Sequence, residues 1–199
     1  MGTGASERSE LREIGKRAVR AEIAQRAVVM LDDQGFDQTT VEELSAAVGI
    51  SPRSFFRYFA TKEDIAIGDL PAMGRLIETA LLKRPADETP WVALRASFVA
   101  LERVADADVE NRRRVTRVAL STPALRAKTL ERHAEWAAFL SPLVAARLEG
   151  KQDRPKVAAD AITQAALACL YVATSAWSEG GTQSYGSLID DAFEAVANL

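Results

Sequence analysis

Hydrophobic residues recur along this chain at the three-to-four-residue spacing of amphipathic helices, and no segment shows the clear alternation of a strand. The first clear helix covers residues 21–34 and is ended by Gly35. Its apolar face carries Ile23, Ala27 and Leu31. Ala, Leu, Glu and Arg, which favour helices, are abundant throughout. The pattern therefore predicts an all-α protein.

Two short helices follow, each marked by its own capping residues. Thr39 or Thr40 can cap the first, because a glutamate stands three residues behind each of them, and Gly49 marks its end. Ser51 is an N-cap for the second, and Pro52 fits its first turn. The segment "SPRSFFRYF" therefore forms a helix of one to two turns.

The same periodicity predicts helices in the rest of the chain. A helix starts at Thr61, and residues 83–90 form a loop. Further helices are expected over about residues 91–105, 109–120, 123–150, 156–178 and 187–198. Pro142 should kink the third of these unless it falls in a break.

Two short capped helices joined by a tight turn, with Arg and aromatic residues in the second, are typical of a helix-turn-helix that reads the major groove of DNA. Arg53, Ser54 and Arg57 come out on one face near the end that meets base edges. Phe55 and Phe59, like Leu44 in the first helix, fit a core better than a contact surface. The spacing thus separates a reading face from a packing face.

Composition limits the class of protein. A chain of 199 residues suits one domain, or a small module fused to a larger one. The start of the chain lacks an apolar signal region, and no apolar run approaches the roughly 20 residues that cross a bilayer. We therefore expect a cytoplasmic protein with no membrane contact. The single cysteine, Cys169, cannot form an internal disulfide and is expected in the core.

The charge balance does not by itself predict DNA binding. The net charge is −3, and residues 1–64 carry nine Arg and Lys against eleven Asp and Glu. The acids, however, lie mainly at helix starts and in i,i+4 pairs with basic residues. Arg12, Lys16 and Arg20 recur every four residues, so they form a basic stripe if the first helix extends back. A solvated, partly disordered arm is the alternative.

Residues 17–65, "RAVRAEIAQRAVVMLDDQGFDQTTVEELSAAVGISPRSFFRYFATKEDI", resemble the TetR family of bacterial transcriptional regulators. The Gly-Phe pair, the double Thr, the turn glycine, the Tyr-Phe pair and the Lys-Glu pair all stand at the family's spacing. The resemblance implies a DNA-binding helix-turn-helix domain, a larger helical domain that binds a small effector, and a homodimer joined through the last two helices. The expected division is a flexible arm over 1–16, a DNA-binding domain over 17–65 and an effector-binding and dimerisation domain over 66–199.

The resemblance also implies roles for individual residues in DNA binding. The family's major-groove positions fall on Arg53, Ser54 and Phe56, with Arg57 nearby, and its phosphate-contacting positions on Thr40, Tyr58 and Lys62. Arg53 can bond a guanine edge bidentately, and Phe56 can touch a thymine methyl. The chain departs from the family at Phe56, where Tyr is usual, and at Ser45 and Val48, where Ala is common. Plain capping by the threonine, packing by the tyrosine and solvation of the basic side chains are the alternatives.

The segment 111–150 resembles a subgroup found with mycofactocin regulators and acyl-CoA-responsive repressors, through its "RRRV", "STPALRA" and "LERHAEW" blocks. That resemblance implies a long-chain acyl thioester, a CoA ester, as effector. Such a ligand needs an apolar cavity with a basic mouth. Candidate cavity residues are Trp91, Phe98, Leu120, His133, Trp136, Phe139, Tyr171 and Trp177, and candidate phosphate ligands are Arg112, Arg113, Arg114 and Arg117. Ordinary core packing and a solvated charged face are the alternatives.

The segment 158–177 alternates small and large apolar residues over several turns. This composition suits either the helix-to-helix packing of a four-helix dimer interface or a helix buried within one chain. The family resemblance favours the dimer, whose two-fold symmetry predicts a palindromic operator.

No pattern of an enzyme is visible. The only histidine is His133, and Glu131 precedes it by two residues, off the same helical face. There is no nucleophile elbow, phosphate-cradling loop or cysteine cluster, and no cofactor is expected. We interpret the chain as a homodimeric DNA-binding repressor released by a small hydrophobic effector. The alternative is a helical ligand-binding protein or enzyme with a vestigial helix-turn-helix.

Overall fold

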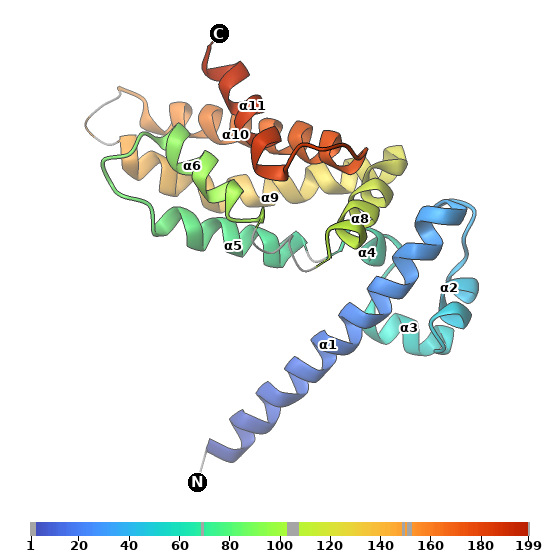
Figure 1. Cartoon of the computed structure of the whole chain (residues 1–199). Coiled ribbons are helices and arrows are strands. Elements are labelled where there is room, and N and C mark those ends of the chain that lie inside the picture. Colours follow the sequence, from blue (N-terminus) through green and yellow to red (C-terminus); the bar gives the residue numbers. More distant parts are fainter. Residues whose placement is uncertain (1–2, 69, 103–107, 149, 151–152, 199) are drawn as a thin grey trace.

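The computed structural model describes residues 3–68, 70–102, 108–148, 150 and 153–198, with side chains from residue 14 onward apart from Leu70. These residues form helices joined by turns and loops, with no strand among them, which confirms the all-α prediction. The chain folds into a small N-terminal domain beside a larger helical bundle (Figure 1).

The N-terminal domain contains α1 (Thr3–Gln34), α2 (Val41–Ala47), α3 (Pro52–Tyr58) and α4 (Glu63–Ala66). Thr40 caps α2 in a reciprocal capping box with Glu43, and the hydroxyl of Ser51 accepts the N–H of Ser54 to cap α3. Thr39 is instead buried and donates to the carbonyl of Gly35 at 2.9 Å. Of the two threonines, Thr40 is thus the cap.

A compact core holds these short helices against α1. Leu44 and Phe55 are fully buried there, and Phe59 packs against Phe55 with ring centroids 5.4 Å apart. Gly49 ends α2 with φ +77°, a left-handed conformation that residues with a Cβ rarely adopt. The core interpretation of these apolar positions is confirmed.

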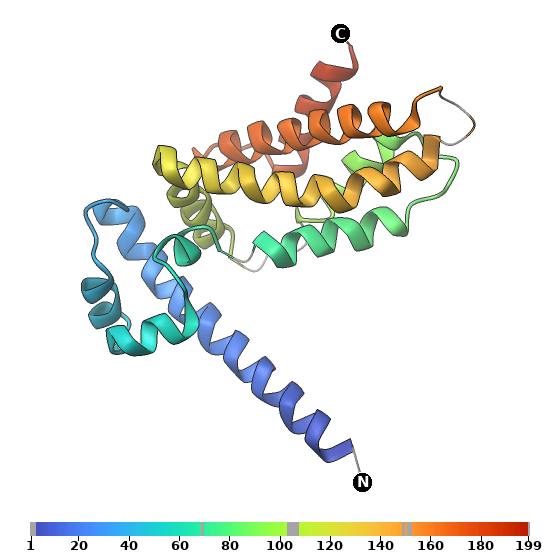
Figure 2. The same ribbon diagram turned by 180° about the vertical axis from the view of Figure 1, so that it is seen from behind.

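The larger domain contains α5 (Leu70–Leu82), α6 (Pro90–Val99), α8 (Val109–Ser121), α9 (Pro123–Leu148), α10 (Pro155–Ser178) and α11 (Tyr185–Ala197). The two long helices α9 and α10 pack side by side along the bundle. Seen from behind, α5 lies along one side of α9, while α11 packs on α10 and α6 (Figure 2).

The two domains share side chains. The N-terminal core also contains Val118 and Ala119 of α8 and Leu125 of α9. Helix α8 therefore packs against α1 as well as against α9 and α10.

Several boundaries differ from the predicted ones. Helix α1 begins at Thr3, so the segment expected as a flexible arm is largely helical. The helix expected from Thr61 is divided into α4 and α5 near Gly68, whose φ is +67°. Helix α9 continues through Pro142 without a break, and α6 ends at Val99. The end predicted for α6, near residue 105, lies outside the described residues.

Helix α10 corrects the expectation that no apolar stretch of the chain approaches the length that crosses a bilayer. Among the described helices, it is the one whose length and mean hydropathy, 1.4, would suit a bilayer. An apolar stretch of near-spanning length is therefore present. Helices α8, α9 and α11 pack along it, and 39% of its apolar stretch is buried in the bundle.

Gly74 of α5 permits a close approach to α9. A Cβ at this position would lie 2.5 Å from the indole nitrogen of Trp136. Gly74→Ala should therefore lower the free energy of unfolding by about 1–3 kcal/mol, through overpacking. Gly15→Ala is the matched control, because nothing lies within 4 Å of its added Cβ. Urea unfolding monitored by circular dichroism measures both, and a Gly74→Ala variant as stable as the wild type would contradict the contact.

Candidate nucleic-acid interface and ligand pocket

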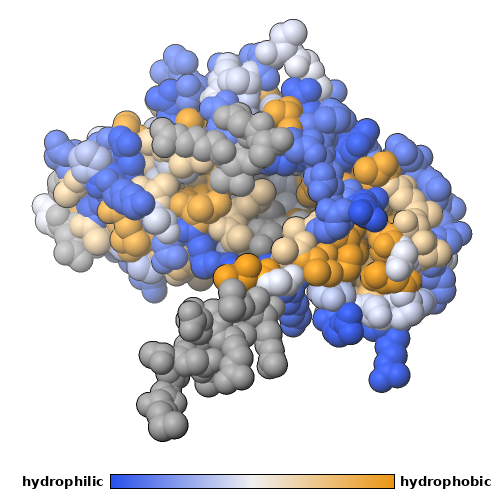
Figure 3. All heavy atoms as spheres, turned by 60° about the horizontal axis from the view of Figure 1, so that its bottom comes forward, coloured by the Kyte–Doolittle hydropathy of each residue, from blue (hydrophilic) through white to orange (hydrophobic). Residues whose placement is uncertain are grey.

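Helix α3 presents a charged and aromatic face to solvent. Arg53 and Arg57 are exposed, Ser54 is half-buried, and the ring of Phe56 is 56% exposed. Phe55 turns the other way into the core, with its ring edge-on to Phe56 at 5.5 Å. Figure 3 shows this side of the molecule, where an apolar area lies among hydrophilic side chains. A short helix is thus anchored by one ring while the next ring faces outward.

The end of α3 couples a basic side chain to a phenol. The guanidinium of Arg57 lies over the ring of Tyr58, 4.9 Å from its centroid, and donates to its hydroxyl at 3.1 Å. The stacking holds both polar groups at the same surface position, because the planar guanidinium fits the ring face.

Thr40 is engaged by its own helix. Its hydroxyl donates to Oε2 of Glu43 at 2.8 Å and accepts the N–H of Glu43 at 3.2 Å. The backbone N–H of Thr40 bonds the Glu43 carboxylate and lowers its pKa. Its phosphate role stays a prediction, beside an established role as cap.

Lys62 is held inside the domain to a degree that the sequence did not suggest. Its ammonium donates to the carbonyls of Phe36 and Thr39, at 2.7 and 2.8 Å, and lies 4.1 Å from the centre of the Phe36 ring. Two of its three N–H groups are thus used to join the α1–α2 loop to the start of α4. Its phosphate role also stays a prediction.

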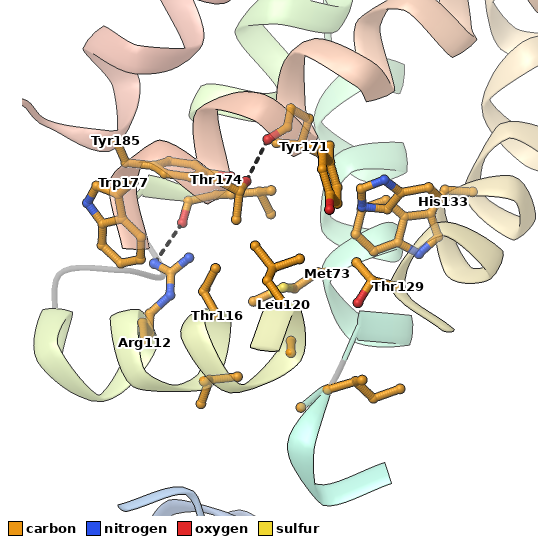
Figure 4. Close-up of a pocket in the computed structure, with 17 residues that line it drawn as sticks. Met73, Arg112, Thr116, Leu120, Thr129, His133, Tyr171, Thr174, Trp177 and Tyr185 are labelled. Atoms are coloured by element: carbon orange, nitrogen blue, oxygen red, sulfur yellow. Dashed lines mark hydrogen bonds between the residues drawn. The ribbon is translucent and has the colours of Figure 1, made fainter. Parts of the chain in front are cut away.

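A cavity of about 310 Å³ lies in the larger domain, between α8, α9 and α10, and reaches the link between α4 and α5. Most of its wall is apolar or aromatic, as Figure 4 shows. It is lined by Ile67, Gly68, Met73, Leu101, Arg112, Val115, Thr116, Ala119, Leu120, Thr129, His133, Trp136, Leu170, Tyr171, Thr174, Trp177 and Tyr185.

The polar groups of the cavity are few and mostly neutral. His133 is buried, with its ring 4.9 Å from that of Trp136, and burial lowers its pKa to about 4. The hydroxyls of Tyr185 and Thr174 lie 3.1 Å apart, and burial raises the pKa of Tyr185. At neutral pH the cavity therefore offers an uncharged imidazole and several hydroxyls, with the Arg112 guanidinium as its cation.

Comparison with known families agrees with this architecture. The family described as "Bacterial regulatory proteins, tetR family" matches residues 21–67, and the family described as "MftR C-terminal domain" matches residues 88–199. The chain belongs to the TetR family of bacterial transcriptional regulators. The resemblances drawn from residues 17–65, and from segment 111–150 to mycofactocin regulators, are thereby confirmed.

Two similar proteins are named as transcriptional regulators. The chain is 36% identical over 143 residues to the HTH-type transcriptional regulator TcmR of Streptomyces glaucescens, covering 69% of this chain and 63% of that protein. It is 30% identical over 129 residues to MftR of Mycobacterium tuberculosis (strain ATCC 25618 / H37Rv), named for mycofactocin biosynthesis, covering 65% of each. The matched part thus spans just under two thirds of either relative.

The solved structures show the same fold. FadR from Bacillus subtilis, crystallised in complex with stearoyl-CoA, superposes with a TM-score of 0.59 at 19% identity, covering 87% of this chain and 95% of that chain. The likeness extends over both domains, so the TetR-family division into a helix-turn-helix and a helical bundle holds for this chain.

Within this TetR-family bundle, the predicted cavity residues divide into two groups. Leu120, His133, Trp136, Tyr171 and Trp177 line the cavity, and their contact with a ligand stays a prediction. Trp91, Phe98, Phe139 and Arg117 do not line it.

The excluded residues have other partners. Trp91 and Phe98 both pack on the ring of Phe193 in α11, at 4.5 and 5.8 Å, and Phe139 packs against the core of the bundle. Placing them in the wall of this cavity was wrong, because they pack against α11 and the other helices instead.

Arg117 faces the other domain rather than the cavity. Its guanidinium donates to both oxygens of Asp32 in α1, at 3.1 and 2.6 Å, and to Glu110 at 3.1 Å. Arg114 also lies 3.7 Å from Asp32. The prediction from sequence failed here because the partner of Arg117 is 85 residues away.

The prediction from sequence also missed cavity residues with hydroxyl groups. Thr116, Thr129, Thr174 and Tyr185 all contribute to the wall. A signal existed on α8, where Arg112, Thr116 and Leu120 recur every four residues and so share one face. No comparable signal marked Tyr185, because it lies in the first turn of α11, directly after a glycine-rich loop.

The burial of His133 predicts a pH dependence of stability. Between pH 6.5 and 4 the unfolded chain binds a proton at this residue that the folded chain does not, so stability falls as the pH falls through this window. The loss at pH 5 relative to pH 7 should be about 2 kcal/mol. The difference between wild type and His133→Gln in chemical unfolding from pH 7 to 4.5 measures it. Parallel curves for the two proteins would contradict the burial.

Proposed function

We propose that the protein is a sequence-specific DNA-binding transcriptional regulator, acting in the cytoplasm as a repressor that a small hydrophobic effector releases from DNA. The exposed face of α3, with Arg53, Phe56 and Arg57 on a helix anchored by buried Phe55, carries this proposal. A separate apolar cavity, walled by a helix that also pairs with α1, supports the effector response.

In this proposal each group on α3 has a role set by its chemistry. Arg53 donates bidentately to a guanine edge, and Phe56 contacts a thymine methyl. The hydroxyl of Ser54 hydrogen-bonds to a donor or an acceptor on a base edge. Arg57 and Tyr58, stacked together, contact phosphates. Thr40 and Lys62 add phosphate contacts only through groups that their cap and loop bonds leave available.

We further propose that the protein acts as a homodimer. Three large apolar side chains on α9 and α10 are exposed, at 51%, 64% and 59%: Leu130, Val157 and Val172. Exposed alanines, among them Ala134, Ala138, Ala161 and Ala168, surround them and permit close helix packing. A patch of this kind is typical of a protein interface.

This patch changes which helices we propose for the dimer. The resemblance implied the last two helices, α10 and α11, but α11 turns Ile189 and Phe193 into its own bundle. We therefore pair α9 with α10 in the interface. Two-fold symmetry about this face would present two α3 helices to the two halves of a palindromic operator.

For the effector we propose a long-chain acyl-CoA. The mostly apolar cavity suits an acyl chain, and B. subtilis FadR, which shares the fold, was crystallised with stearoyl-CoA. Arg112 and Arg113 lie 5.6 and 5.3 Å from the ring centre of Trp177 at one wall, where they would meet the phosphates. The rival is a ligand-binding helical protein or enzyme with a vestigial helix-turn-helix, which predicts no sequence-selective DNA binding.

Selection of tight-binding duplexes from a random DNA library tests the reading face. Wild type should select a palindrome, and Arg53→Ala should lose preference at one base pair in each half-site, at a cost of about 1–3 kcal/mol there. Arg154→Ala, which removes an exposed arginine at the start of α10, is the control and should select the wild-type motif. An unchanged motif for Arg53→Ala would refute its role, and no motif for folded wild type would favour the rival.

The Arg117–Asp32 pair should couple the cavity to the DNA-binding domain. A long-chain acyl-CoA should weaken binding of wild type to its selected operator by roughly 5–150-fold. Arg117→Met should keep operator binding but lose most of that response, because both hydrogen bonds from α8 to Asp32 are lost and only the longer Arg114 contact, at 3.7 Å, remains. Arg95→Met, which breaks the exposed pair of Arg95 with Asp190, is the matched control. Fluorescence anisotropy with labelled operator measures all three, and an undiminished response in Arg117→Met would contradict the coupling.

A further inference from the structure

The first half of α1 stands apart from the rest of the molecule. The helix runs unbroken from Thr3, and each described side chain from residue 14 to residue 22 is exposed. In both ribbon views this half projects beyond α3, away from the bundle formed by α5 to α11 (Figures 1 and 2). It is therefore a solvent-exposed helix surface over residues 14–22.

The part of this helix that adjoins the helix-turn-helix, residues 14–21, is basic. The eight residues 14–21 contain three basic side chains and no acid. Lys16 and Arg20 stand one turn apart on the same face of the helix. Among the side chains that the structure describes, no carboxylate forms an ion pair with either of them. Of the acids that flank this stretch along the helix, Glu13 and Glu22, Glu22 is paired to Arg26 at 2.7 Å.

The basic stretch of α1 reaches the end of α3. The guanidinium of Arg20 lies 5.0 Å from the centre of the Phe59 ring, directly after the last turn of α3. A guanidinium that stacks on a ring keeps its N–H edges available to other acceptors. Arg20 thus places the basic stretch of α1 beside the end of α3.

We propose that Lys16 and Arg20 on the projecting half of α1 bind DNA phosphates just outside each half-site that α3 reads. The inference rests on the proposed function and adds a second contact surface to it. Two cations one helical turn apart, about 6 Å along the axis, present separate donors to a phosphate backbone. Such contacts carry no base preference, so they increase affinity and salt dependence and leave the selected motif unchanged.

The salt dependence of operator binding measures these contacts. Full-length wild type and Lys16→Ala/Arg20→Ala are compared on the selected operator with about one helical turn (10 base pairs) of flanking DNA on each side. The variant should bind roughly tenfold more weakly or worse at low salt, and its log-log salt slope should be shallower by roughly 2 to 4 for a dimer. Hydroxyl-radical footprinting should lose protection in the flanks and keep it in the half-sites.

Three controls test whether the loss of affinity arises at this surface of α1. Lys83→Ala/Arg154→Ala removes the same charge from exposed positions in the larger domain and should keep the wild-type slope. A duplex that ends at the half-site edges should remove the difference between wild type and the α1 variant. Circular dichroism should show the same helix content for all proteins, because alanine favours helix.

The outcomes are distinct. An α1 variant with the slope and footprint of wild type overturns the inference and leaves the proposed function standing. Equal losses on the trimmed and the flanked duplex also overturn it, because the substitutions would then act through α3 and not through flanking phosphates. Failure of wild type to select any motif overturns the proposed function, and this inference with it.

Discussion

The ion pair between Arg117 and Asp32 makes α8 part of two domains at once. One face of α8 supplies Arg112, Thr116 and Leu120 to the cavity wall, and another carries the guanidinium that both oxygens of Asp32 accept. Asp32 is mostly buried, so this pair is less screened by water than an ordinary surface pair. Val118 and Ala119, which pack into the N-terminal core, add an apolar contact beside it. A ligand that displaces α8 cannot do so without disturbing α1.

The N-terminal domain is built so that such a displacement reaches α3 as a unit. Phe55 and Phe59 fix α3 to the domain core, while the Lys62 ammonium ties the α1–α2 loop to the start of α4. Helix α4 in turn packs on both α1 and α8. Short helices with few residues of their own are therefore oriented by contacts with their neighbours, and a rigid-body shift of the domain moves the reading face without unfolding it.

Local signals in the sequence were sufficient to predict the features that depend on residues close together along the chain. The caps at Thr40 and Ser51, the end of α2 at Gly49 and the inward face of α3 all follow from spacing within a few residues, and all are found. Helix α1 was underestimated because its described side chains from residue 14 to residue 22 are all exposed, so hydrophobic periodicity could not reveal this part of it.

Predicting the residues of the cavity wall would have required knowing which helices meet, and the spacing of residues along the sequence does not contain that information. Trp136 and Trp177 line it whereas Trp91 packs on Phe193, although all three are aromatic residues on helices. The difference is set by which helices meet, a long-range property. Threonines in the wall were missed for another reason, because a periodicity of apolar residues gives no weight to a side chain that is half polar.

The internal position of the Lys62 ammonium affects how substitutions accumulate in this domain over evolution. An arginine there would keep the formal charge, but its longer side chain and larger planar head group would have to fit where a single ammonium lies between two carbonyls and the face of Phe36. Selection for a folded loop is then enough to retain lysine at this position, whatever DNA is bound. The α3 surface has no such constraint at Arg53 or Phe56, whose side chains are exposed. Under the proposed role of α3, operator preference can therefore diverge among descendants of this chain while the framework that orients α3 stays the same.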